Sequence, residues 1–377
     1  MAPGGRYGLR VLLMRFLRLL ALGGTLAACS RSALDGGRGQ PGSDAGPDAC
    51  VTVKVGDVAR TPAIQQATFG GGAIDSDDDL LLLVAGLSGN GVWAESISAI
   101  RLGSGEPLAM TRAGDSRVTL GPSTRVTWDS TYHRAIVLGG GRGLVDPNAD
   151  DRQVFAMRIE GTSAVLSLLP DFPGGTTSDV PLAAAVDSVM SRLIVIPEKG
   201  GQAGPVQTWA LSLAPGGEQW SLLAADGALQ SVQMLSLSYD PARNRMLAFG
   251  GGAMWALSLE SPSLGWTQIP GTLPPALMDY ATGPLGAGLA LAWDDQVCAF
   301  VTAITDGSCN YEVWRLDVGD TFTASPLGVA AQPETRYGRG AGAFDARRRN
   351  FVFGSAFDCE LGHDYVAASS DFLPVLP

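Results

Sequence analysis

The sequence predicts an all-β fold in which four-stranded antiparallel sheets repeat around a central axis. One pattern occurs six times: an apolar stretch ends in Asp, turn residues follow, and a second apolar stretch begins. These Asp residues lie 51 to 58 residues apart, and a near-constant period of this length is typical of radially repeated sheets. Only 17% of the 377 residues are charged and 50 are Gly, which suits short strands joined by tight turns. We therefore predict a six-bladed β-propeller. The six repeated residues are Asp75, Asp129, Asp187, Asp240, Asp294 and Asp345.

Residues 1–28 are predicted to be a signal peptide. Four Arg residues precede a short apolar core at Leu19–Leu26, which is too short to span a bilayer. The core ends in Leu26-Ala-Ala-Cys29, which resembles the lipobox of bacterial lipoproteins. That resemblance implies cleavage before Cys29 and acylation of its thiol. Ser30 then favours the outer membrane, on its periplasmic or surface face. The alternative is an ordinary signal peptide followed by an incidental Cys.

Residues 29–50 are expected to form a flexible linker between the lipid and the domain at 51–377. They are rich in Gly, Ser, Asp and Pro and could bury too little apolar surface to offset the entropy of ordering. Removal of residues 1–28 takes away four Arg and no acid, so the net charge changes from −11 to −15. Such an acidic chain disfavours nucleic acid and anionic lipid as partners. We expect membrane contact through the lipid alone, and a protein or glycan partner.

Residues 235–270 show the repeating unit most clearly. Strands are predicted at Leu235–Tyr239, Met246–Phe249, Met254–Leu259 and Trp266–Ile269, with a turn after Asp240 and a Gly triplet after the second strand. The third strand recurs in other units with an aromatic residue at its second position, which we interpret as packing between neighbouring blades. These aromatic residues are Phe155, Trp209, Trp255 and Trp314.

Two stretches, residues 128–140 and 239–251, resemble kelch repeats. Each carries an aromatic residue before the Asp and a Gly pair after the second strand, and the pattern covers roughly residues 60–370. Two units depart from it, because Ile196-Pro197 and Val301-Thr302 stand where Gly-Gly is expected. The resemblance implies a β-propeller, in a family that includes binding scaffolds and a few enzymes.

The ends of the chain are predicted to close the ring. Val51–Val55 reads as a lone strand ahead of the first unit. We expect it to pair in the last blade, beside or in place of a strand from Asp371–Leu376, which would remove an open edge. The third strand of that blade is expected at Tyr365–Ala368. Pro374 and Pro377 make the C-terminal segment a poor interior strand.

Long loops between second and third strands are predicted to share one face of the propeller, where binding residues usually lie. These loops are Gly86–Glu95, Gly140–Arg152, Pro197–Gln207, Ala303–Asn310 and Gly354–Asp364. Ordinary solvated loop side chains are the alternative for each candidate. The candidates are Trp93, Arg142, Asp146, Asp150, Asp151, Arg152, Lys199, Asp306, Asn310, Glu360 and Asp364.

Four cysteines remain if Cys29 carries lipid, and they permit two disulfides in an exported protein. Cys309 and Cys359 both fall in the loops of the predicted binding face, so a disulfide between them would hold that face together. Cys50 and Cys298 would then be left over. Spacing alone leaves the connectivity open.

No complete catalytic or metal-binding set is found in the sequence. The copper radical oxidases that share the resemblance need two His, but His133 and His363 are predicted at opposite ends of the blades. Asp75–Asp79 is interpreted as a solvated turn rather than a calcium site, because it lacks the Gly and distal Glu of an EF-hand. We therefore expect a binding module without metal or cofactor. An enzyme acting on a carbohydrate or other polar ligand at the channel mouth is the alternative, and a structural envelope component is a third.

Overall fold

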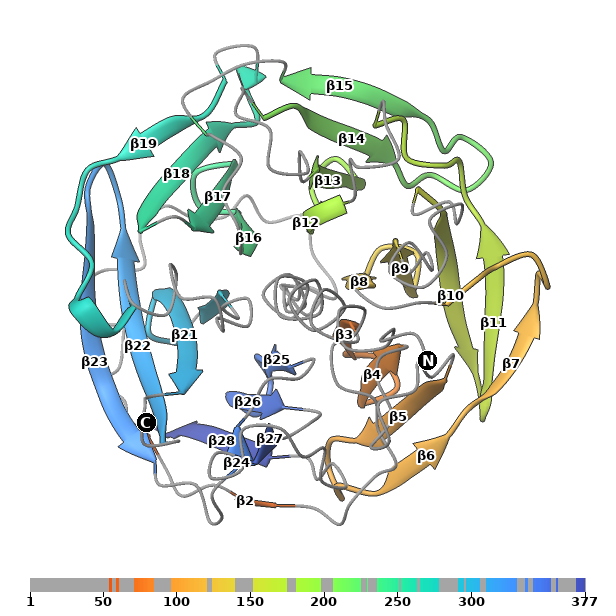
Figure 1. Cartoon of the computed structure of the whole chain (residues 1–377), viewed down its shortest axis with the longest axis horizontal. Helices are drawn as coiled ribbons and strands as arrows, with labels where there is room; N and C mark the ends of the chain where they lie inside the picture. The colour runs from red at the N-terminus through yellow and green to blue at the C-terminus, as the bar shows by residue number, and fades with distance from the viewer. Residues whose placement is uncertain are drawn as a thin grey trace, which may run out of the picture.

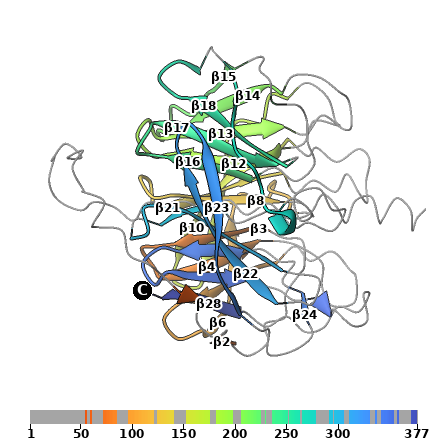
Figure 2. The same cartoon turned by 90° about the vertical axis from the view of Figure 1, so that its left-hand side faces the viewer.

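The computed structural model arranges β-sheets in a ring around a central axis (Figure 1). Turned by 90°, the ring is seen from its edge, with the strands running across its thickness (Figure 2). The structure describes residues 54–55, 59–60, 71–84, 96–120, 124–139, 152–174, 181–197, 206–224, 229, 236–250, 252–262, 265–277, 291–294, 296–305, 310–330, 336–337, 342–353, 357–358 and 371–376.

Five sheets each contain four strands that are consecutive in the chain and pair antiparallel in the order 1-2-3-4. They are the four-stranded blades of a β-propeller, and their innermost strands are β3, β8, β12, β16 and β20. The first sheet is β3 (Gly71–Asp75), β4 (Leu80–Val84), β5 (Ile97–Arg101) and β6 (Pro107–Ala109). The second is β8 (Arg125–Asp129), β9 (Arg134–Leu138), β10 (Val154–Glu160) and β11 (Ser163–Leu168). The third is β12 (Pro181–Asp187), β13 (Arg192–Pro197), β14 (Thr208–Ser212) and β15 (Trp220–Ala224). The fourth is β16 (Ser236–Asp240), β17 (Arg245–Gly250), β18 (Ala253–Ser258) and β19 (Thr267–Ile269). The fifth is β20 (Ala292–Asp294), β21 (Ala299–Thr305), β22 (Tyr311–Val318) and β23 (Phe322–Ala330).

The last repeat unit differs from the prediction, because its sheet is not made of four consecutive strands. It combines strands from both ends of the chain, in the order β25-β26-β28-β1, and β2 also pairs with β28. The predicted third strand at Tyr365–Ala368 lies outside the described residues, and β28 takes the position beside β26. The bounds are β25 (Gly342–Asp345), β26 (Asn350–Phe353), β28 (Asp371–Leu376), β1 (Lys54–Val55) and β2 (Ala59–Arg60). A separate pair is formed by β24 (Arg336–Tyr337) and β27 (Phe357–Asp358).

The two Pro residues near the C-terminus predicted that β28 would be a poor interior strand. The structure nevertheless places β28 in the interior of this sheet, between β26 on one side and β1 and β2 on the other. On one side Pro374 is in register with Asn350 of β26. On the other side the paired residues of β28 are Asp371 and Phe372 with β2, and Val375 and Leu376 with β1. Pro374 therefore lies between the residues that pair with β1 and those that pair with β2.

A fifth strand, β7 (Thr111–Gly114), joins the second sheet from outside the predicted pattern. It follows β6 of the first sheet but pairs parallel with β11, the outer strand of the second. Gly114 has a φ of 87°, and a Cβ there would lie 2.2 Å from the Leu166 carbonyl oxygen. Only Gly fits this close approach. The segment therefore straps two neighbouring blades together at the rim.

All six repeated Asp residues occupy the same place, the last residue of the innermost strand of their sheet. Each is at most 3% exposed. The Asp75 Oδ1 accepts the backbone N–H groups of Asp77 and Asp78 at 3.0 and 3.1 Å, and equivalent bonds occur in the other five turns. A short carboxylate that accepts its own backbone two and three residues on is a favoured turn initiator. The repeat marks turn geometry rather than a reactive site.

The fourth residue after each repeated Asp has a left-handed backbone. The values of φ lie between 44° and 61°, and the residues are Asp79, His133, Ser191, Asn244, Cys298 and Arg349. A left-handed conformation costs about 1–2 kcal/mol for most L-residues but little for Gly. Five of the six turns therefore carry a residue that is neither Gly nor Asn at a position that favours those two.

We expect Ser191→Gly to stabilise the protein by about 0.5–1 kcal/mol, since Gly relieves the left-handed strain while its extra unfolded-state entropy offsets part of that gain. Chemical denaturation of the variant checks this value. Ser163→Gly, within β11, is the control, and it should lower the free energy of unfolding. A Ser191→Gly variant less stable than the wild type would contradict the strain assigned to this turn.

Apolar clusters fill the spaces between neighbouring sheets. The second and third sheets share a cluster that contains Phe172, with Trp209 packed against it, and Phe155 and Trp314 lie in two further inter-sheet clusters. Trp255 packs against the cluster of the third and fourth sheets. The four aromatic residues of the third strands therefore serve core packing, as predicted. The fifth sheet packs against Phe344 and Phe351 of the last sheet, which in turn shares a cluster with the first sheet.

Candidate functional site

The predicted loop face lies almost wholly outside the described residues. Arg152 and Asn310 are described, at the ends of two of the loops, and both are partly buried. The Arg152 carbonyl oxygen accepts the backbone N–H of Phe172 at 2.8 Å, which anchors the loop end to the following strand connection. The remaining candidates stay predictions: Cys29, Trp93, Arg142, Asp146, Asp150, Asp151, Lys199, Asp306, Cys309, Cys359, Glu360 and Asp364.

The opposite end of the ring is well described. Because strands alternate in direction, the turns between first and second strands and those between third and fourth strands lie at the same end of each blade. His133 lies in the β8–β9 turn of this end, as predicted. His363, predicted at the other end, lies outside the described residues.

The acidic turn after β3 was predicted to be solvated, but its first residue, Asp75, is buried, and Asp77 and Asp79 form ties to neighbouring sheets. The Asp77 carboxylate lies 2.6 Å from Nδ1 of His133 in the second sheet, and this contact raises the pKa of His133. Asp79 receives two guanidinium bonds from Arg348 of the last sheet, at 2.5 and 2.6 Å, and they raise the pKa of Arg348. Within the described ranges, no group of three His, Cys, Asp or Glu side chains could hold a metal ion.

Most repeated Asp residues pair with an Arg. In three turns the partner is the fifth residue on: Arg134 with Asp129, Arg192 with Asp187 and Arg245 with Asp240. Asp345 pairs with Arg348 of its own turn, and Asp294 with Arg349 of the neighbouring sheet. Asp75 has no cationic partner within the described chain, and burial raises its pKa from 3.8 to about 6. Burial likewise raises the pKa of Asp129, although Arg134 lowers it in part.

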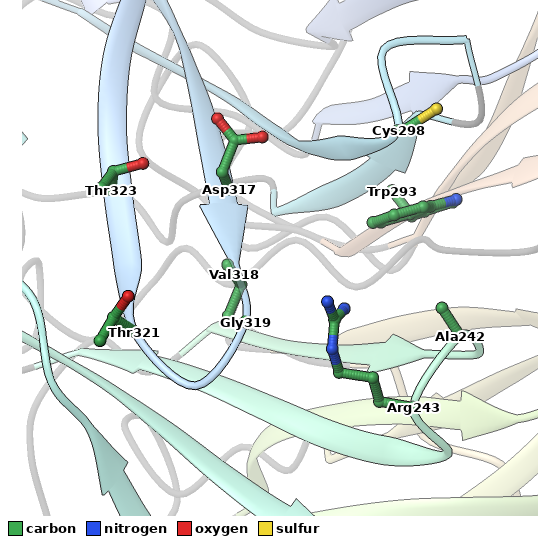
Figure 3. A pocket seen from close by; sticks show the side chains of 9 residues that line it. All are labelled: Ala242, Arg243, Trp293, Cys298, Asp317, Val318, Gly319, Thr321 and Thr323. Atoms are coloured by element: carbon green, nitrogen blue, oxygen red, sulfur yellow. The ribbon is translucent and has the colours of Figure 1, made fainter. Parts of the chain in front are cut away.

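A cleft opens at this end between the fourth and fifth sheets (Figure 3). Its volume is about 520 Å³, and one wall is the β16–β17 turn with Ala242 and Arg243. The opposite wall is the β22–β23 hairpin, and Trp293 of β20 and Cys298 complete the lining. Arg243 extends from its turn into the space between Trp293 and the end of β22. The lining residues of the hairpin are Asp317, Val318, Gly319, Thr321 and Thr323.

Hydrogen bonds between the two sheets hold the walls of this cleft in place. Arg245, which pairs with Asp240, also donates to the carbonyl oxygens of Gly319 and Val318 at 3.1 and 3.0 Å. The Phe322 N–H donates to the Pro270 carbonyl at 2.9 Å. These bonds fix the hairpin beside the turn that carries Arg243. The cleft is therefore part of the framework of the fold.

Arg243 is the cation that the cleft framework uses least. Its Nη1 lies 3.5 Å from Asp240 Oδ2, while Arg245 Nε lies only 2.9 Å from the same oxygen. Asp317 is engaged by Arg315, whose Nε and Nη2 donate to it at 2.9 and 2.7 Å. The Arg243 side chain is 46% exposed. Most of its five N–H donors therefore face the cleft or solvent.

Sequence reasoning missed this cleft. Trp293 precedes Asp294 just as the buried Trp128 and Tyr239 precede their Asp residues, so its position in the repeat does not mark it as a cleft residue. It is only partly buried and meets Phe300 edge-on, with ring centroids 5.1 Å apart. The available signal was Arg243, a second Arg in a turn whose Asp already has Arg245 as its partner.

Cys298 is disulfide-bonded, and its partner in the chain is left open by the sequence. The other four cysteines, including the predicted Cys309–Cys359 pair, lie outside the described residues.

Comparison with known proteins finds solved structures of similar fold. No protein-family profile matches the chain, and no curated protein matches it. A solved structure titled "Structure of YjhT" is similar, with a TM-score of 0.48 and 10% sequence identity, over 70% of this chain and 84% of that one. No helix in the described part of the chain is long and apolar enough to cross a membrane.

Proposed function

We propose that the protein is an exported, lipid-anchored, kelch-like propeller of six blades that binds a protein or glycan partner at the cell envelope. The observation that carries the binding role is a ring of sheets tied to their neighbours by ion pairs and apolar clusters. Such a scaffold holds the loops at one end in fixed relative positions, and rigid scaffolds with varied loops are commonly used for recognition.

The proposal of a sixth blade and a closed ring has three supports. The sheet of β25, β26, β28 and β1 carries the same Asp turn and left-handed residue as the other five. Arg348 binds Asp79 of the first sheet, and Ala343 and Val352 pack in one cluster with Ile74 and Leu81. The first described strand, β1, pairs with β28 at the other end of the chain. An experimental structure in which the first and last sheets are separated would contradict closure.

The proposal of a kelch-like chain rests on the two stretches, residues 128–140 and 239–251, that resemble the repeat. Their strands and turns fall in the same places: β8–β9 and β16–β17, each with an Asp–Arg pair across the turn. We also propose that two disulfides form in the exported protein, one of them through Cys298, with the connectivity open.

Lipid anchoring is tested by Cys29→Ser. If Cys29 is acylated, the wild type should partition with membranes and the variant should appear in the soluble fraction, because lipid chains contribute about 0.8 kcal/mol per buried CH₂. Membrane flotation of both proteins, with palmitate labelling, gives the measurement. Ser32→Ala, a change outside the lipobox, is the matched control. Equal flotation of wild type and Cys29→Ser would remove the anchoring proposal.

The binding role is tested with the acylated full-length protein. We expect cross-linking in intact envelopes, followed by affinity capture, to recover one partner that is absent when a lipoprotein of unrelated fold is used as bait. A glycan array covers the alternative partner class. If neither approach yields a specific ligand, the binding role is not supported even where anchoring holds.

A further inference from the structure

We propose that the cleft between the β16–β17 turn and the β22–β23 hairpin is a binding site for a small anionic ring polyol, one that carries a carboxylate or a phosphate. The site lies at the end of the ring opposite the loops discussed above, so it is independent of the proposed partner-binding face. The inference stands on the charge of Arg243, the lining of the cleft and the fixed position of its walls.

Charge is the first argument. The chain has a formal net charge of −11, yet Asp240 and Asp317, the carboxylates beside the cleft, are each bound by another Arg. Asp240 takes its shorter bond from Arg245, and Asp317 takes its bonds from Arg315. Among the described residues, the Arg243 guanidinium has one hydrogen bond, to Asp240 at 3.5 Å. Its planar donor fork matches a carboxylate or phosphate in two parallel bonds.

The remaining lining explains why the ligand should carry a ring and hydroxyl groups. Trp293 is partly buried and borders the cleft, and an indole offers the apolar surface on which a sugar ring can lie. Thr321 and Thr323 are exposed on the hairpin and belong to the lining of the cleft. Their hydroxyls can donate to and accept from a polyol.

Size and rigidity agree with a small ligand. A volume of about 520 Å³ falls within the usual range for small-molecule sites, about 300–1,000 Å³. The carbonyls of Val318 and Gly319 are held by Arg245, and Phe322 is held by Pro270. A ligand therefore meets a preformed site and orders little on binding.

Three sugars that differ at one position test the proposal by isothermal titration calorimetry on the mature protein. Glucuronate carries a carboxylate at carbon 6, glucose 6-phosphate carries a phosphate there, and glucose carries a hydroxyl. We expect at least one anionic probe to bind with a dissociation constant of about 1 mM or below, and glucose to bind about tenfold more weakly or not at all. Preference for one anion identifies the head group. Equal binding of all three sugars, or binding of none, overturns the proposal.

Variants locate the binding. Arg243→Gln should weaken the better anionic probe by about ten- to a hundredfold, the range expected for charge-assisted hydrogen bonds, and Arg243→Lys should recover part of it. Arg158→Gln removes the same charge from an exposed position on β10 of the second sheet and should leave affinity unchanged. If Arg243→Gln binds as the wild type does, the anion lies elsewhere and the assignment fails. Matching circular dichroism spectra of the variants exclude misfolding as the cause.

Discussion

Asp294→Ala is expected to lower the free energy of unfolding by about 3–5 kcal/mol, the usual range when one partner of a buried ion pair is removed. Arg349 is 5% exposed at its side chain, and its Nε and Nη2 both donate to Asp294 Oδ2, at 2.9 and 2.8 Å. Its Nη1 is buried and has no hydrogen-bond partner among the described residues. The variant would therefore leave a whole guanidinium group buried without compensation. The pair also joins the fifth sheet to the sheet of the chain ends.

Urea denaturation followed by circular dichroism measures this loss. Glu106→Ala provides the matched control, since its pair with Arg101 is more than half exposed on both sides and should contribute no more than about 1 kcal/mol. The double variant Asp294→Ala/Arg349→Met should recover much of the stability, because apolar replacement of both partners leaves no buried charge. A loss below about 1 kcal/mol in the single variant would show that Arg349 finds water or another acceptor.

The repeat could be predicted from the sequence because each turn depends on local chemistry. An Asp that accepts the backbone two and three residues on needs no distant partner, so the period in sequence becomes a period in space. The Arg partners could not be predicted with the same certainty. Asp240 and Arg245 lie in one turn, whereas Asp294 meets Arg349, 55 residues away, in another sheet. The second kind of pair depends on how neighbouring blades pack.

Elements at the rim of the ring were harder to predict than those near the axis. β7 is short, largely exposed and polar, so no apolar alternation marks it as a strand. β28 contains Pro374. This residue lies between the part of β28 that pairs with β2 and the part that pairs with β1. Both elements obtain their pairing from strands distant in the sequence or in another blade. Their positions therefore depend on tertiary packing rather than on local sequence.

The cleft illustrates the same limit for function. Trp293 and Arg243 come from different sheets, 50 residues apart in the chain, and neither forms a motif alone. Only the packing of the fourth sheet against the fifth brings them to one space. The loops at the other end are long and polar, and they remain the predicted face for a partner.

Asp75→Asn is expected to stabilise the protein at neutral pH by about 1–2 kcal/mol. Burial raises the pKa of Asp75 from 3.8 to about 6 and outweighs the backbone bonds from Asp77 and Asp78, which lower it. Since one pKa unit is worth about 1.4 kcal/mol, ionisation of Asp75 opposes folding by at most about 3 kcal/mol. Asn keeps a side-chain oxygen for the two N–H groups and carries no charge. Burial of its amide N–H groups offsets part of the gain.

The pH dependence separates this effect from a simple gain in packing. A carboxyl whose pKa is higher in the folded state binds more protons there, so its contribution to wild-type stability is fully present below pH 3.8 and is lost as the pH rises to about 6. The advantage of Asp75→Asn should therefore be near zero at pH 4 and reach its full size above pH 6. His133, whose pKa is raised by Asp77, changes stability in the same direction, so the comparison is made in a His133→Gln background.

Asp129→Asn is the contrasting case. Burial raises the pKa of Asp129 too, but the variant would weaken the pair with Arg134, which is 4% exposed, and should destabilise the protein at pH 7. If the advantage of Asp75→Asn is the same at pH 4 and pH 7, the Asp75 carboxyl does not change its protonation state in this range. The gain would then come from the hydrogen bonds and packing of the turn, not from removal of a buried charge.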